Sequence, residues 1–249
     1  YAALVALYVL LFPYHPGLRS PNELCRLWQT RALVEYGTLD INQALRDFGY
    51  VGDLSVMNGR YYPSKAPLLS FAAVPLYAGM RALGGGSLYA VREVPLVFFA
   101  RLLLTVLPTL LLLGLVRRYL RAYVSPGTAD AVTVTYGLGS LAFSYSLLFM
   151  SHQTTAVLLF GGFYALWRVA RGDWRERGYL VAGACAGATL AAEYTGGLGV
   201  LGLVHPAYRV HAGLDPSAIT PSNIWFGHVF AGLSFLGAWA LGALHSTAR

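Results

Sequence analysis

The chain has 249 residues, of which 56% are hydrophobic and only 12% are charged, and its mean hydropathy is +0.53. An ordinary soluble domain carries about 25% charged residues, so this composition excludes that class and indicates a protein surrounded largely by lipid. The formal net charge of +7 fits loops beside anionic head groups better than a nucleic-acid partner. Cys25 and Cys185 lie far apart and predict neither a disulfide framework nor a metal cluster.

Long apolar segments recur along the chain at the length that a membrane-crossing helix needs, about 20 residues. We therefore predict an all-α fold: a polytopic transmembrane helical bundle of about seven spans, forming one domain over 1–249. The first segment is short and begins at Tyr1 rather than Met, so we expect the natural chain to start further upstream. The predicted spans are 1–13, 66–83, 95–116, 129–150, 154–170, 178–204 and 225–245.

The loop over 14–65 carries five of the chain's 11 acidic residues, more than any other connecting segment, so a chemical site is expected there first. The letters SPNE at 20–23 place a cap residue before Pro at the first helical position and Glu three residues after the cap. This capping box predicts a helix from there to about residue 36, ended by Gly37. Its apolar residues fall on one side, which predicts an amphipathic helix lying on the membrane surface.

Two further short elements are predicted in the same loop. The letters DINQ at 40–43 repeat the capping pattern and predict a second surface helix that ends at Gly49. Asn58 and Gly59, set between apolar and aromatic residues, predict a two-residue β-hairpin turn within 54–62.

The letters PNE at 21–23, RALVEYG at 31–37 and GRYYPSKAPL at 59–68 follow the first apolar segment in a characteristic order. This order of features resembles the GT-C membrane glycosyltransferases, the group that includes protein O-mannosyltransferases and lipid A aminoarabinose transferases. The likeness runs from residue 1 to about residue 204, and it looks most like the bacterial members. The tail over 205–249 does not match the family, whose members continue for several more spans.

The resemblance implies a bacterial multi-pass protein of the cytoplasmic (inner) membrane that transfers a sugar, with inversion, at the outer face. The donor would be a sugar on a polyprenyl phosphate, and the acceptor a hydroxyl or amine of a glycan, lipid or protein. A first-loop carboxylate acts in the family as general base, and Glu23 occupies the matching position. Relatives often carry an Asp-Glu pair there, whereas this chain has Asn22-Glu23.

Each candidate in the loop also has a structural alternative. Glu23 is equally suited to close the capping box. Lys65 is a candidate to hold the donor phosphate, or else an interfacial lysine whose charged end reaches water. Tyr62 lies in the aromatic entry to the next segment as a candidate substrate contact. Asp53 is a loop residue or a contact for substrate or a divalent metal, although no firm metal or other cofactor site is predicted.

Three candidates lie in or between the apolar segments. Arg101 and Glu193 each interrupt an apolar run, and ionisable groups there are usually functional or paired with an opposite charge. Arg101 is therefore predicted to meet a phosphate or an acid. His152, in the polar letters SHQ at 151–153, is a candidate substrate contact or a hydrogen-bonded turn residue.

Charge and topology conflict in this prediction. Arginines cluster after the segments 95–116 and 154–170, and the positive-inside rule makes that side cytoplasmic. If every early segment crosses, the loop 14–65 lies on the same side, against the outer-face site. Segment 66–83, short and containing Pro67 and Pro75, is the natural candidate for a partial crossing. Two rival classes stay open: a transporter with Arg101 and Glu193 in a polar path, and a non-catalytic lipid-binding scaffold.

Overall fold

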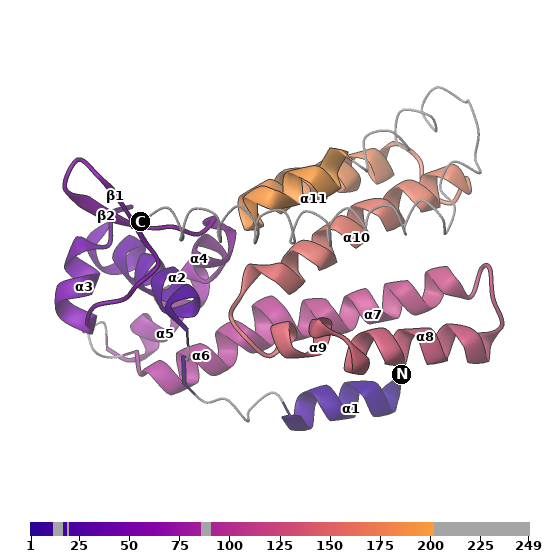
Figure 1. The fold of residues 1–249 in the computed structure, drawn as a ribbon, viewed down its shortest axis with the longest axis horizontal. Helices are drawn as coiled ribbons and strands as arrows, with labels where there is room; N and C mark the ends of the chain where they lie inside the picture. The colour runs from indigo at the N-terminus through magenta and orange to yellow at the C-terminus, as the bar shows by residue number, and fades with distance from the viewer. Residues whose placement is uncertain (12–16, 19, 86–90, 202–249) are drawn as a thin grey trace, which may run out of the picture. The chain divides into compact units, whose positions relative to one another are not determined.

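The computed structural model describes residues 1–11, 17–18, 20–85 and 91–201, and it is mostly helical (Figure 1). Contacts divide the chain into two compact units, 1–157 and 158–249. The helices are α1 (Ala2–Leu11), α2 (Pro21–Arg31), α3 (Asn42–Phe48), α4 (Leu68–Ala72), α5 (Val74–Leu83), α6 (Glu93–Arg101), α7 (Leu107–Leu120), α8 (Pro126–Gly139), α9 (Leu141–Ser146), α10 (Ser151–Ala170) and α11 (Glu176–Ala192). Short π-helical segments continue α2 over Ala32–Tyr36 and join α6 to α7 over Leu102–Val106, and a 3-10 turn covers Tyr194–Gly196.

The local elements predicted in the first loop are present. Ser20 caps α2, its side chain accepting from the Glu23 N–H, and the helical run ends at Gly37, whose backbone is left-handed. The second helix, α3, ends at Gly49. Strands β1 (Leu54–Met57) and β2 (Arg60–Pro63) pair antiparallel around Asn58 and Gly59, both with positive φ, as a tight primed turn requires.

The prediction that the first-loop helices lie on a surface is wrong for α2. Nearly all its residues from Glu23 to Arg31 are buried, including those expected on its polar side. Polar partners make this burial tolerable: Arg26 donates to the Ser151 hydroxyl at 2.7 Å, and the Thr30 hydroxyl donates to the Ser70 carbonyl at 2.9 Å. Buried on both its apolar and its polar side, α2 is a core helix, so its amphipathic pattern does not predict a surface position.

The predicted bundle of about seven spans is also wrong, and with it the multi-pass inner-membrane assignment. Among the described residues, one helix, Glu93–Leu120, is long and apolar enough to cross a membrane. Over half of its most apolar stretch, 56%, is buried inside the protein, as in a core helix. Apolar length alone does not distinguish a helix that faces lipid from one that packs against other helices, and much of this apolar surface is packed.

Local breaks explain why the other segments fall short. Segment 66–83 divides at Ala73 into α4 and α5, and segment 129–150 divides where Ser140 leaves helical geometry and caps α9. The helix α10 has the length, but it opens with the polar letters SHQTT. Glu193, in extended conformation, ends α11. The predicted span 225–245 lies outside the described residues.

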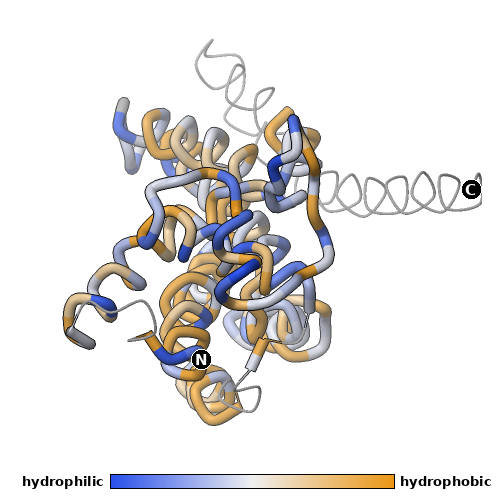
Figure 2. The backbone as a smooth tube through the Cα atoms, turned by 90° about the vertical axis from the view of Figure 1, so that its left-hand side faces the viewer, coloured by the Kyte–Doolittle hydropathy of each residue, from blue (hydrophilic) through white to orange (hydrophobic). Residues whose placement is uncertain are grey.

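Several apolar clusters hold the first unit together, and two of them position the first-loop helices and α1. One surrounds the first-loop helices and includes Leu27, Trp28 and Tyr77, and it holds α2 against α3, α5 and α6. The other joins α1 to α7 and α8, where the buried Tyr8 hydroxyl donates to the Gly137 carbonyl at 2.7 Å. Figure 2 shows hydrophobic residues along much of the helical backbone, with hydrophilic stretches between them. The first-loop helices and the hairpin thus stand at one end of the α6–α7 helix (Figure 1).

Candidate functional site

A fully buried ion pair joins two of the predicted site residues. Arg101, at the end of α6, donates to one carboxylate oxygen of Glu23 through Nη2 at 2.6 Å and Nε at 3.2 Å. The backbone N–H of Phe149 donates to the same oxygen at 2.8 Å, and Arg101 also donates to the Gly17 carbonyl. Arg101 therefore meets an acid, one of the two partners that the sequence predicted for it.

This ion pair leaves Glu23 inaccessible. Both side chains are 1% exposed, and the α2 N-terminus carries the carboxylate into the protein beside α6. A general base has to come within hydrogen-bond reach of the proton that it removes. In this conformation Glu23 offers no surface to an acceptor, so the arrangement of the pair is that of an anchor between α2 and α6.

A second ion pair lies at the surface, where the chain enters and leaves the hairpin. Lys65 Nζ lies 3.1 Å from the Asp53 carboxylate, and each side chain is 29% exposed. The Ser64 hydroxyl donates to the other Asp53 oxygen at 3.0 Å, while the Ser64 N–H donates to the Asp53 carbonyl. Asp53 has a φ of +66°, which is uncommon outside glycine and indicates a backbone held by its surroundings.

The surface pair stands over the start of α2. A Cβ built on Gly52 would lie 3.6 Å from the Pro21 side chain, so the residue before Asp53 packs on the first turn of that helix. Burial raises the pKa of Cys25 to about 11, and the charges of Asp53 and Lys65 are near enough to act on the same thiol. The first turns of α2 thus bring the surface pair and the buried pair into one region.

The remaining predicted residues are dispersed. Tyr62, on β2, pairs across the hairpin with Ser55. His152 stands at the start of α10 with its ring edge-on to Tyr145, the ring centres 4.8 Å apart. Glu193 belongs to the second unit, at the end of α11. The structure therefore gathers Glu23, Arg101, Asp53 and Lys65 near the start of α2, whereas Glu193 belongs to the other unit.

Sequence reasoning missed a buried cation on α2. The Arg31 guanidinium is centred 3.9 Å from the Phe48 ring centre and 5.0 Å from that of Trp28, and burial lowers the pKa of Arg31. Nearby, Glu35 accepts from Tyr77 and Arg81, both at 2.8 Å. The spacing of Trp28 and Arg31, three residues apart on one helix, is the signal that predicts such stacking.

Chemically, the two ion pairs differ in what they can do. The buried Glu23 carboxylate accepts from a guanidinium and a backbone N–H, an arrangement typical of a structural ion pair. In a partly exposed pair, the lysine and the carboxylate can each leave the other and bind a group of the substrate, because water already competes for both. No group of three metal-binding side chains occurs among the residues described, so no divalent metal site stands out there.

Comparison with known proteins found no matching family model, no similar curated protein and no similar solved structure.

Proposed function

We propose that the chain is a glycosyltransferase that moves a sugar from a polyprenyl-phosphate-type donor to an acceptor hydroxyl or amine, with inversion. The donor class and the inversion come from the resemblance carried by the letters PNE at 21–23 and GRYYPSKAPL at 59–68. The structural observation that carries the proposal is the partly exposed Lys65–Asp53 pair over the first turn of α2.

Lys65 suits the leaving group of such a reaction. A lysine ammonium is a compact point charge that commonly binds phosphate, and Lys65 lies on the segment that runs from the hairpin into α4. When a phosphate oxygen replaces the Asp53 carboxylate at Nζ, Lys65 keeps a negative partner. The cation can therefore pass from the resting ion pair to the donor without becoming unpaired.

Asp53 suits the acceptor side of the same reaction. The acceptor oxygen or nitrogen attacks the anomeric carbon, the bond from that carbon to the phosphate oxygen breaks, and its electron pair stays on the phosphate. The acceptor proton passes to the Asp53 carboxylate and from there to water. General-base help of this kind accelerates a reaction by about 10²–10⁴-fold.

Glu23 has a positioning role in this scheme. Its ion pair with Arg101 fixes the start of α2, against which the residue before Asp53 packs. A direct role of Glu23 as base stays a prediction that requires Arg101 to release it, and the two assignments differ in a measurable way.

The test is transfer of radiolabelled sugar from polyprenyl-phosphate donors by cells expressing the full chain, comparing native protein with Asp53→Asn and Lys65→Gln. We expect Asp53→Asn to lower the rate about 10²-fold or more with little effect on donor binding. Lys65→Gln is expected to weaken donor binding. Asp40→Asn and Arg60→Gln are matched controls, because Asp40 and Arg60 form a second ion pair, 3.3 Å apart, that joins β2 to the chain just before α3.

Three results decide the assignment. Loss of transfer on Asp53→Asn alone, with the Asp40 and Arg60 variants active, supports Asp53 as the base. Full activity of Asp53→Asn together with an inactive but folded Glu23→Gln returns the role of base to Glu23. Absence of transfer from every donor, even by native protein, overturns the enzymatic proposal.

A non-catalytic scaffold is the second candidate, and the internal pairing of the acids favours it. Glu23 and Asp53 each already contact a cation of the chain, as acids with purely structural roles do. A scaffold predicts that donor lipid binds without any turnover, and that Asp53→Asn leaves this binding unchanged.

A further inference from the structure

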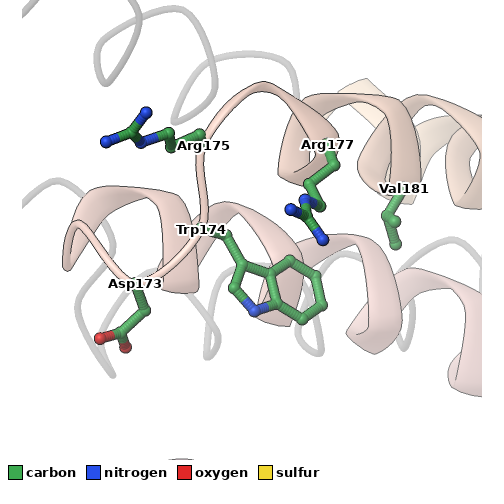
Figure 3. A pocket seen from close by; sticks show the side chains of 5 residues that line it. All are labelled: Asp173, Trp174, Arg175, Arg177 and Val181. Carbon is green, nitrogen blue, oxygen red and sulfur yellow. The ribbon is translucent and has the colours of Figure 1, made fainter.

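The second unit carries a basic pocket that the proposed transfer reaction does not use. An open hollow of about 480 Å³ lies at the connection between α10 and α11 (Figure 3). Arginine is the commonest residue type of this connection. The lining residues are Asp173, Trp174, Arg175, Arg177 and Val181.

The one acid among these lining residues is already neutralised by arginines outside the lining. Asp173 lies 3.1 Å from the Nε of Arg168 and 3.8 Å from that of Arg171. Among the side chains that the structure describes, neither Arg175 nor Arg177 takes part in an ion pair. The described lining residues, one acid and two arginines, therefore carry a net positive charge.

Apolar surface adjoins one of the two arginines. In Figure 3, Arg177 and Trp174 extend toward one another, whereas Arg175 extends to the other side of the connection. Val181 follows Arg177 by four residues on α11, which puts both on one helix face. A ligand beside Arg177 would meet a guanidinium, an indole ring and a valine side chain together.

We propose that this pocket binds a phosphate ester whose phosphoryl group contacts Arg177 and whose carbon skeleton lies against Trp174 and Val181. The planar guanidinium donates two parallel hydrogen bonds to phosphate oxygens, which a solvated ammonium cannot match. The indole ring adds an apolar surface beside this charge. Arg175 contributes only longer-range attraction from the rim, which salt screens. This site is independent of the proposed glycosyl transfer.

The test measures binding of inorganic phosphate and of phenyl phosphate to the full chain by calorimetry. Native protein is expected to bind phenyl phosphate more tightly than inorganic phosphate, because only the ester has a ring to place on Trp174. Arg177→Gln should weaken both by about tenfold. Trp174→Leu should remove the advantage of the phenyl ester while leaving inorganic phosphate bound.

Arg118→Gln is the matched control, since Arg118 is an exposed arginine of α7 in the first unit. Arg177→Lys is the second variant, to be used if Arg177→Gln proves unstable. It keeps the charge but loses the planar guanidinium, so it should bind both phosphates with intermediate affinity. Equal weakening by Arg118→Gln and Arg177→Gln, or no binding of either phosphate by native protein, overturns the proposal.

Binding to vesicles distinguishes the two sources of the phosphate, a lipid head group and a soluble ester. Phosphatidylcholine vesicles with and without phosphatidic acid are floated with native and Arg177→Gln protein. Binding that needs both phosphatidic acid and Arg177 identifies a lipid head group as the ligand. Binding of the soluble esters without any effect of phosphatidic acid identifies a soluble phosphate ester.

Discussion

The Glu23 carboxylate and the Arg101 guanidinium, 78 residues apart in the chain, meet inside the first unit at 2.6 Å. An ion pair this deeply buried is favourable only when other hydrogen bonds compensate for lost water. Here the Phe149 N–H and the Gly17 carbonyl supply them. The pair thereby ties α2 to α6 and positions the turn on which Gly52 and Asp53 rest.

Removing one partner of this pair is expected to be costly. Glu23→Gln or Arg101→Gln leaves a buried charge without its partner, which costs about 3–5 kcal/mol of unfolding free energy. Replacing both by leucine removes both charges and should recover most of that loss. Chemical denaturation measures it, with Arg118→Gln as the exposed control. Equal stability of the single and double variants would contradict a role for the pair as anchor.

In this chain the sequence predicts local structure well, but it does not predict which side chains are buried. The cap at Ser20, the stop at Gly37 and the Asn58-Gly59 turn depend on residues within a few positions of one another, so each is visible in the letters. Whether the second face of α2 meets solvent depends on Ser70 and Ser151, which lie far away in the chain. That information is tertiary, and a pattern within one helix cannot contain it.

The candidate site shows the same contrast between what neighbouring residues predict and what depends on residues far away in the chain. An isolated arginine in an apolar run needs an opposite charge, which predicts a phosphate or an acid beside Arg101. Its pairing with Glu23, rather than with a phosphate, could not be read from spacing. Arg31 was missed because two of its aromatic neighbours, Phe48 and Tyr77, come from other helices.

The backbone at Asp53 gives a prediction separate from its charge. Its φ of +66° is strained for alanine but open to glycine and tolerated by asparagine. Asp53→Gly should therefore be more stable than Asp53→Ala by about 1 kcal/mol, although both lose the contacts with Ser64 and Lys65. Asp53→Asn should approach native stability. Denaturant midpoints measure the order, and Ala equal to Gly would show that the strain is absent.

Stability should fall in acid through Asp47. Hydrogen bonds from Tyr36 and Gln43 hold the pKa of this carboxyl below its ordinary value of 3.8. A lowered pKa in the folded state means that the stabilisation is complete above the ordinary value. It is lost as pH falls through the folded pKa.

The measurement is the thermal midpoint between neutral pH and pH about 3, comparing native protein with Asp47→Asn. We expect the variant to start lower and to lose less on acidification. Asp130, whose pKa Arg117 lowers, contributes acid sensitivity of the same sign, so the variant should keep part of the slope. An unchanged slope would show that the Tyr36–Asp47 contact contributes nothing to folding.

Gly178 sets how closely α11 follows α10 in the second unit. A Cβ there would collide with the Val169 side chain and approach the Ala165 carbonyl at 3.3 Å. Because that carbonyl is backbone, Gly178→Ala should push the two helices apart and destabilise the unit by about 1–3 kcal/mol. Gly183→Ala, on the same helix with open space around it, should be neutral or slightly stabilising. Since Gly178 adjoins Arg177, the same shift should weaken phenyl phosphate binding in Gly178→Ala and leave it intact in Gly183→Ala. Equal denaturation midpoints for the two variants would show that a rotation of the Val169 side chain relieves the contact. In that case the pocket would not depend on the close packing of these helices.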